Sequence, residues 1–117
     1  MHKTDAGQIA VIGVMIEPGA DNPAFDAVWD YLPSADNRER IERASVNAAN
    51  LLPSDRSYFR YMGSFTPPPC TEDVLWMVLT TPVQLSAGQI EKFQAIIDGN
   101  NRPIQPLNGR KILVSAD

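Results

Sequence analysis

Three consecutive prolines at 67–69 separate two apolar segments of this chain. Proline has no backbone N–H, so a regular sheet or helix cannot run through 63–71, and we expect an irregular connection there. The aromatic segment Tyr58–Tyr61 before it and the β-branched segment Val74–Leu79 after it are both typical of strands. The sequence therefore predicts β-structure interrupted by an irregular loop.

Two further strands are indicated near the chain ends. The run QIAVIGVMIEPG at 8–19 predicts a buried strand over roughly 9–16, stopped by a turn at Pro18-Gly19. Lys111–Val114 is predicted to be a final strand, after an extended loop at 100–110 that contains two prolines. Residues 34–50 are charged and polar, and we expect a surface connection with room for one helical turn.

Two short helices complete the pattern. Asn22 is a good N-cap, Pro23 suits the first helical position, and Leu32-Pro33 ends the helix. Ser86 and Gln89 form a capping box that opens the second helix. Their apolar faces are Phe25, Val28, Trp29 and Leu32 in the first helix, and Ile90, Phe93, Ile96 and Ile97, followed by Gly99, in the second. We predict a mostly β fold with short surface helices, an α+β arrangement.

Composition sets outer limits on function. The chain has 117 residues, the size of one small domain, with 44% hydrophobic residues and a net charge of −4. An acidic chain is a poor match for nucleic acid or anionic membranes, and no apolar run approaches the ~20 residues of a membrane span. Polar residues follow Met1, so we expect no signal peptide in this chain. A lone cysteine such as Cys70 is usually a buried apolar residue or an idle thiol.

Five segments, in order, resemble the C-terminal half of a bacterial-type α-class carbonic anhydrase. They are HKTDAGQIAVIGVMIEPG, NAANLLP, YFRYMGSFTPPPCTE, VLWMVLTTPVQLS and NNRPIQPLNGR, which together cover nearly the whole chain. The resemblance implies that residues 1–117 are part of one large, mainly antiparallel twisted sheet. It also implies zinc-dependent, reversible hydration of carbon dioxide to bicarbonate, with these two molecules as substrates and zinc as the cofactor of the full-length family member.

The resemblance assigns roles to individual residues. Thr66 matches the threonine that orients the zinc-bound hydroxide, whereas its residue type alone suggests only a turn before prolines. Val11, Phe65, Val74 and Trp76 match the apolar wall on which carbon dioxide rests, although ordinary core packing would explain them equally well. Phe65 replaces a common leucine, and Pro67 stands where threonine or histidine often sits.

Supporting residues follow from the same resemblance. Tyr61, Asn100 and Arg102 match hydrogen-bonding residues around the site, a role close to plain loop stabilisation. Cys70 matches one half of a disulfide found in exported members, which implies a periplasmic or secreted parent protein. Its partner would lie in the N-terminal half of the family.

The family's three histidine ligands have no counterpart here. His2 is the single histidine, and it matches a position just after the third ligand; a lone histidine is more often a satisfied core residue than a ligand. Zinc catalysis needs about three protein ligands and an open position, so we expect no zinc bound by this chain alone, no activity alone, and marginal stability with aggregation. Three interpretations remain open. The chain is a fragment of an enzyme that its N-terminal half would complete, or a noncatalytic carbonic-anhydrase-related binding or structural module, or an unrelated small β-rich domain.

Overall fold

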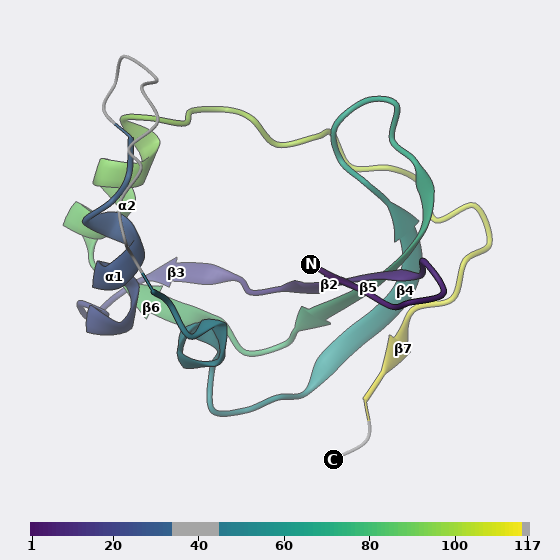
Figure 1. Cartoon of the computed structure of the whole chain (residues 1–117), viewed down its shortest axis with the longest axis horizontal. Coiled ribbons are helices and arrows are strands. Elements are labelled where there is room, and N and C mark those ends of the chain that lie inside the picture. The colour runs from purple at the N-terminus through teal and green to yellow at the C-terminus, as the bar shows by residue number, and fades with distance from the viewer. Residues whose placement is uncertain (34–44, 116–117) are drawn as a thin grey trace. The chain divides into compact units, whose positions relative to one another are not determined.

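The computed structural model describes residues 1–33 and 45–115, and the chain divides into two compact units (Figure 1). Unit 1 comprises residues 1–15, 54–82 and 101–117, and unit 2 comprises residues 16–53 and 83–100. Strands predominate, with short helices, as predicted. The expectation that residues 1–117 are one partial domain stays a prediction.

Unit 1 is a five-stranded sheet with the order β1-β2-β5-β4-β7. Strand β2 is parallel to β5, and the other neighbouring pairs are antiparallel (Figure 1). The strands are β1 (His2–Lys3), β2 (Ile9–Gly13), β4 (Tyr58–Ser64), β5 (Glu72–Leu79) and β7 (Leu113–Val114). The apolar segments on either side of the prolines therefore form the two longest strands, paired with each other.

The register of these strands decides which side chains share a face. Trp76 of β5 lies opposite Tyr61 of β4 and opposite Val11 of β2. Residues opposite each other in a ladder point to the same side of the sheet, so these three belong to one face. Val74, two residues before Trp76, shares it and is 1% exposed.

The predicted continuous strand over 9–16 is wrong. Strand β2 ends at Gly13, and a separate strand β3 (Ile16–Pro18) pairs in parallel with β6 (Val83–Leu85) in unit 2. The break between β2 and β3 coincides with a break in the partner segment. Strand β5 ends at Leu79, and Pro82, just before β6, has no N–H to continue a ladder. Pro18, expected in a turn, is the last residue of β3.

Unit 2 carries the helices. Helix α1 (Asp26–Trp29) follows a 3-10 turn, η1 (Pro23–Phe25), which the Asn22 side chain caps by accepting from the Ala24 N–H at 3.2 Å. Helix α2 (Ala87–Gln94) opens with the predicted capping box, in which both halves are formed. A second 3-10 turn, η2 (Ala48–Leu51), lies at the end of the expected surface connection, whose residues 34–44 are outside the described part.

Helix α2 is shorter than predicted. It ends at Gln94, and the N–H groups of Ile96 and Ile97 both donate to the Phe93 carbonyl. The helical hydrogen-bond ladder therefore tightens and stops before Gly99, which has a positive φ of 60°. The first helix also stops early, at Trp29, so Leu32 lies beyond it.

The core of unit 2 joins the two helices. The Trp29 ring stacks on Phe93 with centroids 5.7 Å apart and meets Phe25 edge-on at 5.3 Å. Gln89 is 8% exposed, and its amide bridges two backbone segments. Its oxygen accepts from the N–H groups of Asn22 and Ser86, and its nitrogen donates to the Asn22 carbonyl.

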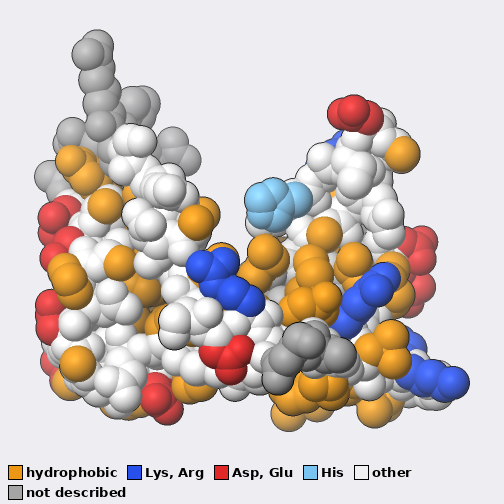
Figure 2. Space-filling view, turned by 90° about the horizontal axis from the view of Figure 1, so that it is seen from below, with side chains coloured by type: hydrophobic (Ala, Val, Ile, Leu, Met, Phe, Trp, Pro, Cys, Tyr) orange, Lys and Arg blue, Asp and Glu red, His pale blue; other side chains and the backbone are white. Residues whose placement is uncertain are grey.

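Much apolar surface stays exposed. Large hydrophobic side chains, orange in Figure 2, reach the surface, and Ile104 is 100% exposed. His2, expected as a satisfied core residue, is exposed instead, on the two-residue edge strand β1. Among the described residues, no helix is long and apolar enough to cross a bilayer.

Candidate functional site

The irregular connection between β4 and β5 is held closed by its own backbone. The Phe65 N–H donates to the Thr71 carbonyl at 2.9 Å, and the Cys70 N–H donates to the Pro67 carbonyl at 2.9 Å. The Pro68-Pro69 peptide bond is cis, and Cys70 has a positive φ of 56°. The predicted irregular segment is thus confirmed from Phe65 onward, while Gly63 and Ser64 belong to β4.

Two side-chain donors fix the carbonyls just before Thr66. The Trp76 indole N–H donates to the Ser64 carbonyl at 3.0 Å, across the β4–β5 pair. The Ser64 hydroxyl donates to the Phe65 carbonyl at 2.9 Å and itself accepts from Arg102 Nη1 at 3.1 Å. Both peptide units that lead into Thr66 are therefore held by hydrogen bonds within unit 1.

Thr66 itself is exposed on this fixed backbone. Its carbonyl accepts a long contact from the Cys70 thiol at 3.6 Å. Within residues 1–33 and 45–115, neither its hydroxyl nor its N–H has a hydrogen-bond partner. A hydroxyl and an N–H that are held in place but not used by the fold are available to a ligand.

The predicted apolar wall forms in part through strand register. Val11 lies opposite Trp76, and Val74 lies opposite Ile9, so these side chains line one face of the sheet. Gly63 makes room for the indole, because a Cβ there would lie 2.9 Å from Trp76 Cδ1. Phe65 is half-buried, and its backbone N–H and carbonyl both form hydrogen bonds within the loop.

A pocket of about 410 Å³ lies between Trp76 and Thr66 of the proline loop, and Val11, Phe65 and Val74 are not among its lining residues. Thr66, Trp76, Tyr61 and Arg102 all line it, so four of the predicted residues meet around one hollow. The Tyr61 and Trp76 rings lie nearly parallel, 7° apart in plane, with centroids at 6.5 Å. The rest of the lining comes mainly from the loop before β7, as Pro103, Ile104, Gln105, Leu107, Arg110 and Ile112, with Gly63 and Ser64 of β4.

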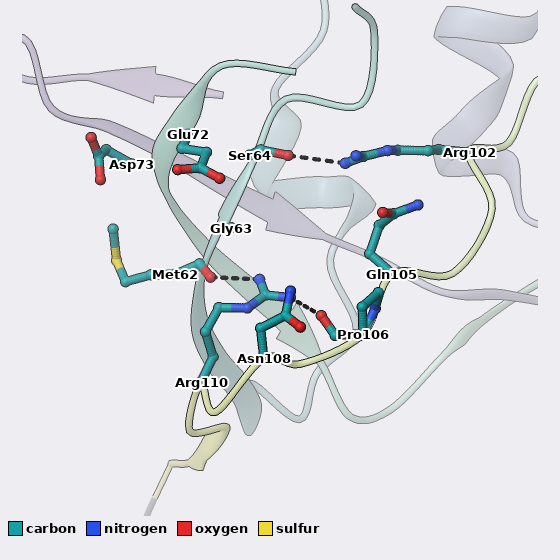
Figure 3. Close-up of a pocket in the computed structure, with 10 residues that line it drawn as sticks. All are labelled: Met62, Gly63, Ser64, Glu72, Asp73, Arg102, Gln105, Pro106, Asn108 and Arg110. Atoms are coloured by element: carbon teal, nitrogen blue, oxygen red, sulfur yellow. Dashed lines mark hydrogen bonds between the residues drawn. The ribbon is translucent and has the colours of Figure 1, made fainter. Parts of the chain in front are cut away.

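A second hollow, shown in Figure 3, is more polar and shares Ser64 and Arg102 with the first. Arg110 closes one side by donating to the carbonyls of Met62, Pro106 and Leu107, all at 2.9–3.0 Å. The two arginines thus tie the loop at 101–112 to the end of β4. Sequence reasoning missed Ser64 and Arg110, whose only signal was a polar residue at a strand end and a second arginine in the same loop.

Asn100 and Cys70, the remaining predicted residues, do not line the pocket beside Thr66. Asn100 is exposed and belongs to unit 2. Cys70 is half-buried with a free thiol, as expected for the only cysteine of the chain. No group of three or more His, Cys, Asp or Glu side chains that could hold a metal occurs within the described residues.

Comparison with known proteins agrees with the resemblance noted in the sequence. The family model for eukaryotic-type carbonic anhydrase matches residues 1–116. Carbonic anhydrases of Nostoc sp. and Pectobacterium carotovorum are 40% and 41% identical over 114 residues, covering 97% of this chain but 43% and 47% of theirs. The chain therefore spans about half the length of these curated relatives.

Solved structures give the same result. The α-carbonic anhydrase of Thermovibrio ammonificans, in complex with the inhibitor sulfanilamide, matches with a TM-score of 0.87 and 43% identity, over 95% of this chain and 50% of that one. Dioscorin complexed with ascorbate matches with a TM-score of 0.83 and 29% identity, over 97% of this chain and 50% of that one. On these grounds the chain belongs to the carbonic anhydrase family.

Proposed function

We propose that this chain is the C-terminal part of an enzyme that reversibly hydrates carbon dioxide to bicarbonate. Its family membership and the names of its bacterial relatives support the reaction class. The observation that carries the proposal is the state of Thr66. Its hydroxyl and N–H are unused, on a backbone that other residues hold in place.

The residues of this chain would act by orientation and exclusion of water. The Thr66 hydroxyl and N–H offer one acceptor and two donors at a fixed position, which can align a reacting oxygen or an anion. Trp76, with the half-buried Val11 opposite it and the buried Val74 packed behind on the same face, presents an apolar surface. A small nonpolar molecule is held weakly on such a surface, by dispersion and by the water it displaces. Phe65 precedes Thr66 in the same loop and is half-buried.

Zinc is the cofactor of the family, and the residues of this chain do not fit a complete zinc site. The sequence contains one histidine and one cysteine, and three protein ligands are needed. We therefore propose that the ligands come from a segment outside this chain, the N-terminal half of the family, and that the chain alone is inactive. A purified sample of the chain with stoichiometric zinc and sulfonamide-sensitive activity would contradict this.

A periplasmic or secreted location of the parent protein forms part of the proposal. The free thiol of Cys70 is half-buried in the proline loop, where a partner cysteine of an N-terminal segment could reach it. Disulfides persist in oxidising compartments. Mass spectrometry of the parent protein, purified without reductant, would show whether Cys70 is bonded.

Complementation tests the function. The chain is co-expressed with the N-terminal half of the Pectobacterium carotovorum relative, and carbon dioxide hydration is followed by stopped-flow with a pH indicator. We expect measurable activity that falls roughly 100-fold in Thr66→Ala, the cost of losing one well-placed polar group. Thr71→Ala is the matched control: Thr71 is also exposed in the loop, and the contact it makes to Phe65 uses its backbone.

A noncatalytic binding or structural module is the second candidate. The single histidine of the sequence favours it, as does the likeness to dioscorin, which was solved with ascorbate. Under this reading the complemented protein would fold but hydrate no carbon dioxide, and Thr66→Ala would behave like Thr71→Ala in every assay.

A further inference from the structure

We infer that Arg102 and Ser64 form a hydrogen-bond relay that orients and polarises the Phe65–Thr66 peptide, so that the Thr66 N–H becomes a ready donor to an anion. The inference rests on the proposed function, because it concerns the same site. It assigns to Arg102 and Ser64 a positioning role that acts on the site through the backbone.

The relay is continuous within unit 1. Arg102 Nη1 donates to the Ser64 hydroxyl oxygen at 3.1 Å, and that hydroxyl donates to the Phe65 carbonyl at 2.9 Å. The Phe65 carbonyl and the Thr66 N–H belong to one planar peptide unit. A charged group therefore stands two hydrogen bonds away from the Thr66 N–H (Figure 3 shows the Arg102–Ser64 step).

Such a chain strengthens its last donor. A hydrogen bond from an ionised donor is stronger than a neutral one, and bonds in a chain polarise one another. Electron density drawn toward the Phe65 carbonyl makes the attached N–H more acidic as a donor. Backbone N–H groups held in this way are the usual partners of developing or bound negative charge.

The open end of the relay is what distinguishes it from loop stabilisation. The Phe65 N–H is satisfied by the Thr71 carbonyl, whereas the Thr66 N–H has no partner in the described residues. Arg110 provides an internal comparison, since it donates to the Met62 carbonyl from the same loop without contacting Ser64. It would polarise the Met62–Gly63 peptide instead.

Amide ¹⁵N chemical shifts test the relay in a sample that contains neither zinc nor substrate. The ¹⁵N-labelled chain is measured alone or, if it aggregates, bound to the unlabelled N-terminal half of the relative. In Ser64→Ala and Arg102→Met we expect an upfield shift of the Thr66 nitrogen, with the Gly63 nitrogen little changed. Arg110→Met should do the reverse, and Arg102→Lys, which keeps a charged donor, should restore much of the Thr66 shift.

Three results would overturn the relay. These are an unchanged Thr66 nitrogen in Ser64→Ala, equal effects of the two arginine variants on both amides, and no difference between Arg102→Lys and Arg102→Met. If Arg102→Met disrupts the whole unit, the milder Ser64→Ala and Arg102→Lys decide the question. The amide shifts and the hydration assay are separate measurements. Unchanged shifts in an active complemented protein overturn the relay alone, whereas the expected shifts without hydration activity overturn the proposed function alone.

Discussion

Replacing Gly63 by alanine should destabilise unit 1, although the change adds a single methyl group. A Cβ at this position would lie 2.9 Å from Trp76 Cδ1 and 3.1 Å from Tyr61 Cε2. Both atoms belong to rigid rings, and both rings come from strands of the same sheet. The methyl group therefore has no flexible neighbour that could move aside at little cost.

The size of the destabilisation in Gly63→Ala can be worked out from these distances. Ordinary contact begins at 3.4 Å, so the indole must retreat by about 0.5 Å. That movement disturbs the 3.0 Å hydrogen bond from Trp76 Nε1 to the Ser64 carbonyl, which weakens as it lengthens or bends. Overpacking of this kind costs about 1–3 kcal/mol, and removing a strand glycine returns about 0.5–1 kcal/mol. We expect a net loss of about 1–2 kcal/mol in the free energy of unfolding.

Gly88 is a matched control for the same chemical change. It lies in α2 with nothing within 4 Å of a built Cβ, and its backbone is helical. Gly88→Ala should therefore stabilise unit 2 by about 0.5 kcal/mol, through the smaller entropy of the unfolded chain. The two substitutions should change the free energy of unfolding in opposite directions.

Urea unfolding of the chain labelled with 5-fluorotryptophan, alone or, if it aggregates, bound to the unlabelled N-terminal half of the relative, measures both effects at once. Trp76 reports on unit 1 and Trp29 on unit 2, and the two ¹⁹F resonances are assigned with Trp29→Phe. Gly63→Ala should lower the midpoint of the Trp76 transition and shift its folded resonance. A Gly63→Ala variant as stable as the parent, with an unchanged Trp76 resonance, would refute the packing argument.

Three further predictions concern stability. Gln89→Met leaves the buried partners of the Gln89 amide unpaired, so the free energy of unfolding followed by Trp29 should fall by about 2–4 kcal/mol. Gln94 is exposed on the same helix, and Gln94→Met should change little in the same urea titration. Hydrogen bonds from the Ser57 backbone, the Ser57 hydroxyl and the Thr81 hydroxyl lower the pKa of Asp55 below 3.8. The stability that Asp55 contributes is present above that value and is lost as the pH falls through the lowered pKa, so acid titrations followed by circular dichroism should show a shallower loss below about pH 3.8 in Asp55→Asn than in the parent chain. Ile104→Lys removes a fully exposed apolar side chain and should reduce aggregation measured by light scattering without moving the urea midpoint.

Local patterns in the sequence predicted local structure well. The capping box of Ser86 and Gln89, the Asn22 cap and the proline-rich interruption depend on residues a few positions apart, and the structure has all three. The break between β2 and β3 could not be predicted in this way, because the run from Ile9 to Ile16 is apolar throughout. What ends β2 is its partner β5, more than 60 residues away.

For the candidate site, residue identities could be predicted from the sequence, but the long-range contacts that hold them could not. The family resemblance supplied Thr66 and Trp76, whose residue types alone suggest a turn and a core position. It did not supply the contacts that hold them, because Ser64 meets Arg102 across 38 positions of sequence. Such a contact depends on how the loop at 101–112 returns to β4, and neither periodicity nor composition encodes that path.

The role of Thr66 can be separated from the stability of its loop, and this separation bears on the choice between enzyme and binding module. The loop is held by donors from Trp76, Ser64 and Phe65, none of which involves the Thr66 side chain. A scaffold without catalytic work would hold its shape equally well with alanine or valine at this position. The hydroxyl is therefore not explained by folding, whereas a site that must align an oxygen atom requires it. Equal stability of Thr66→Ala and the parent chain, together with a loss of hydration in the complemented protein, is the combination that only the enzyme predicts.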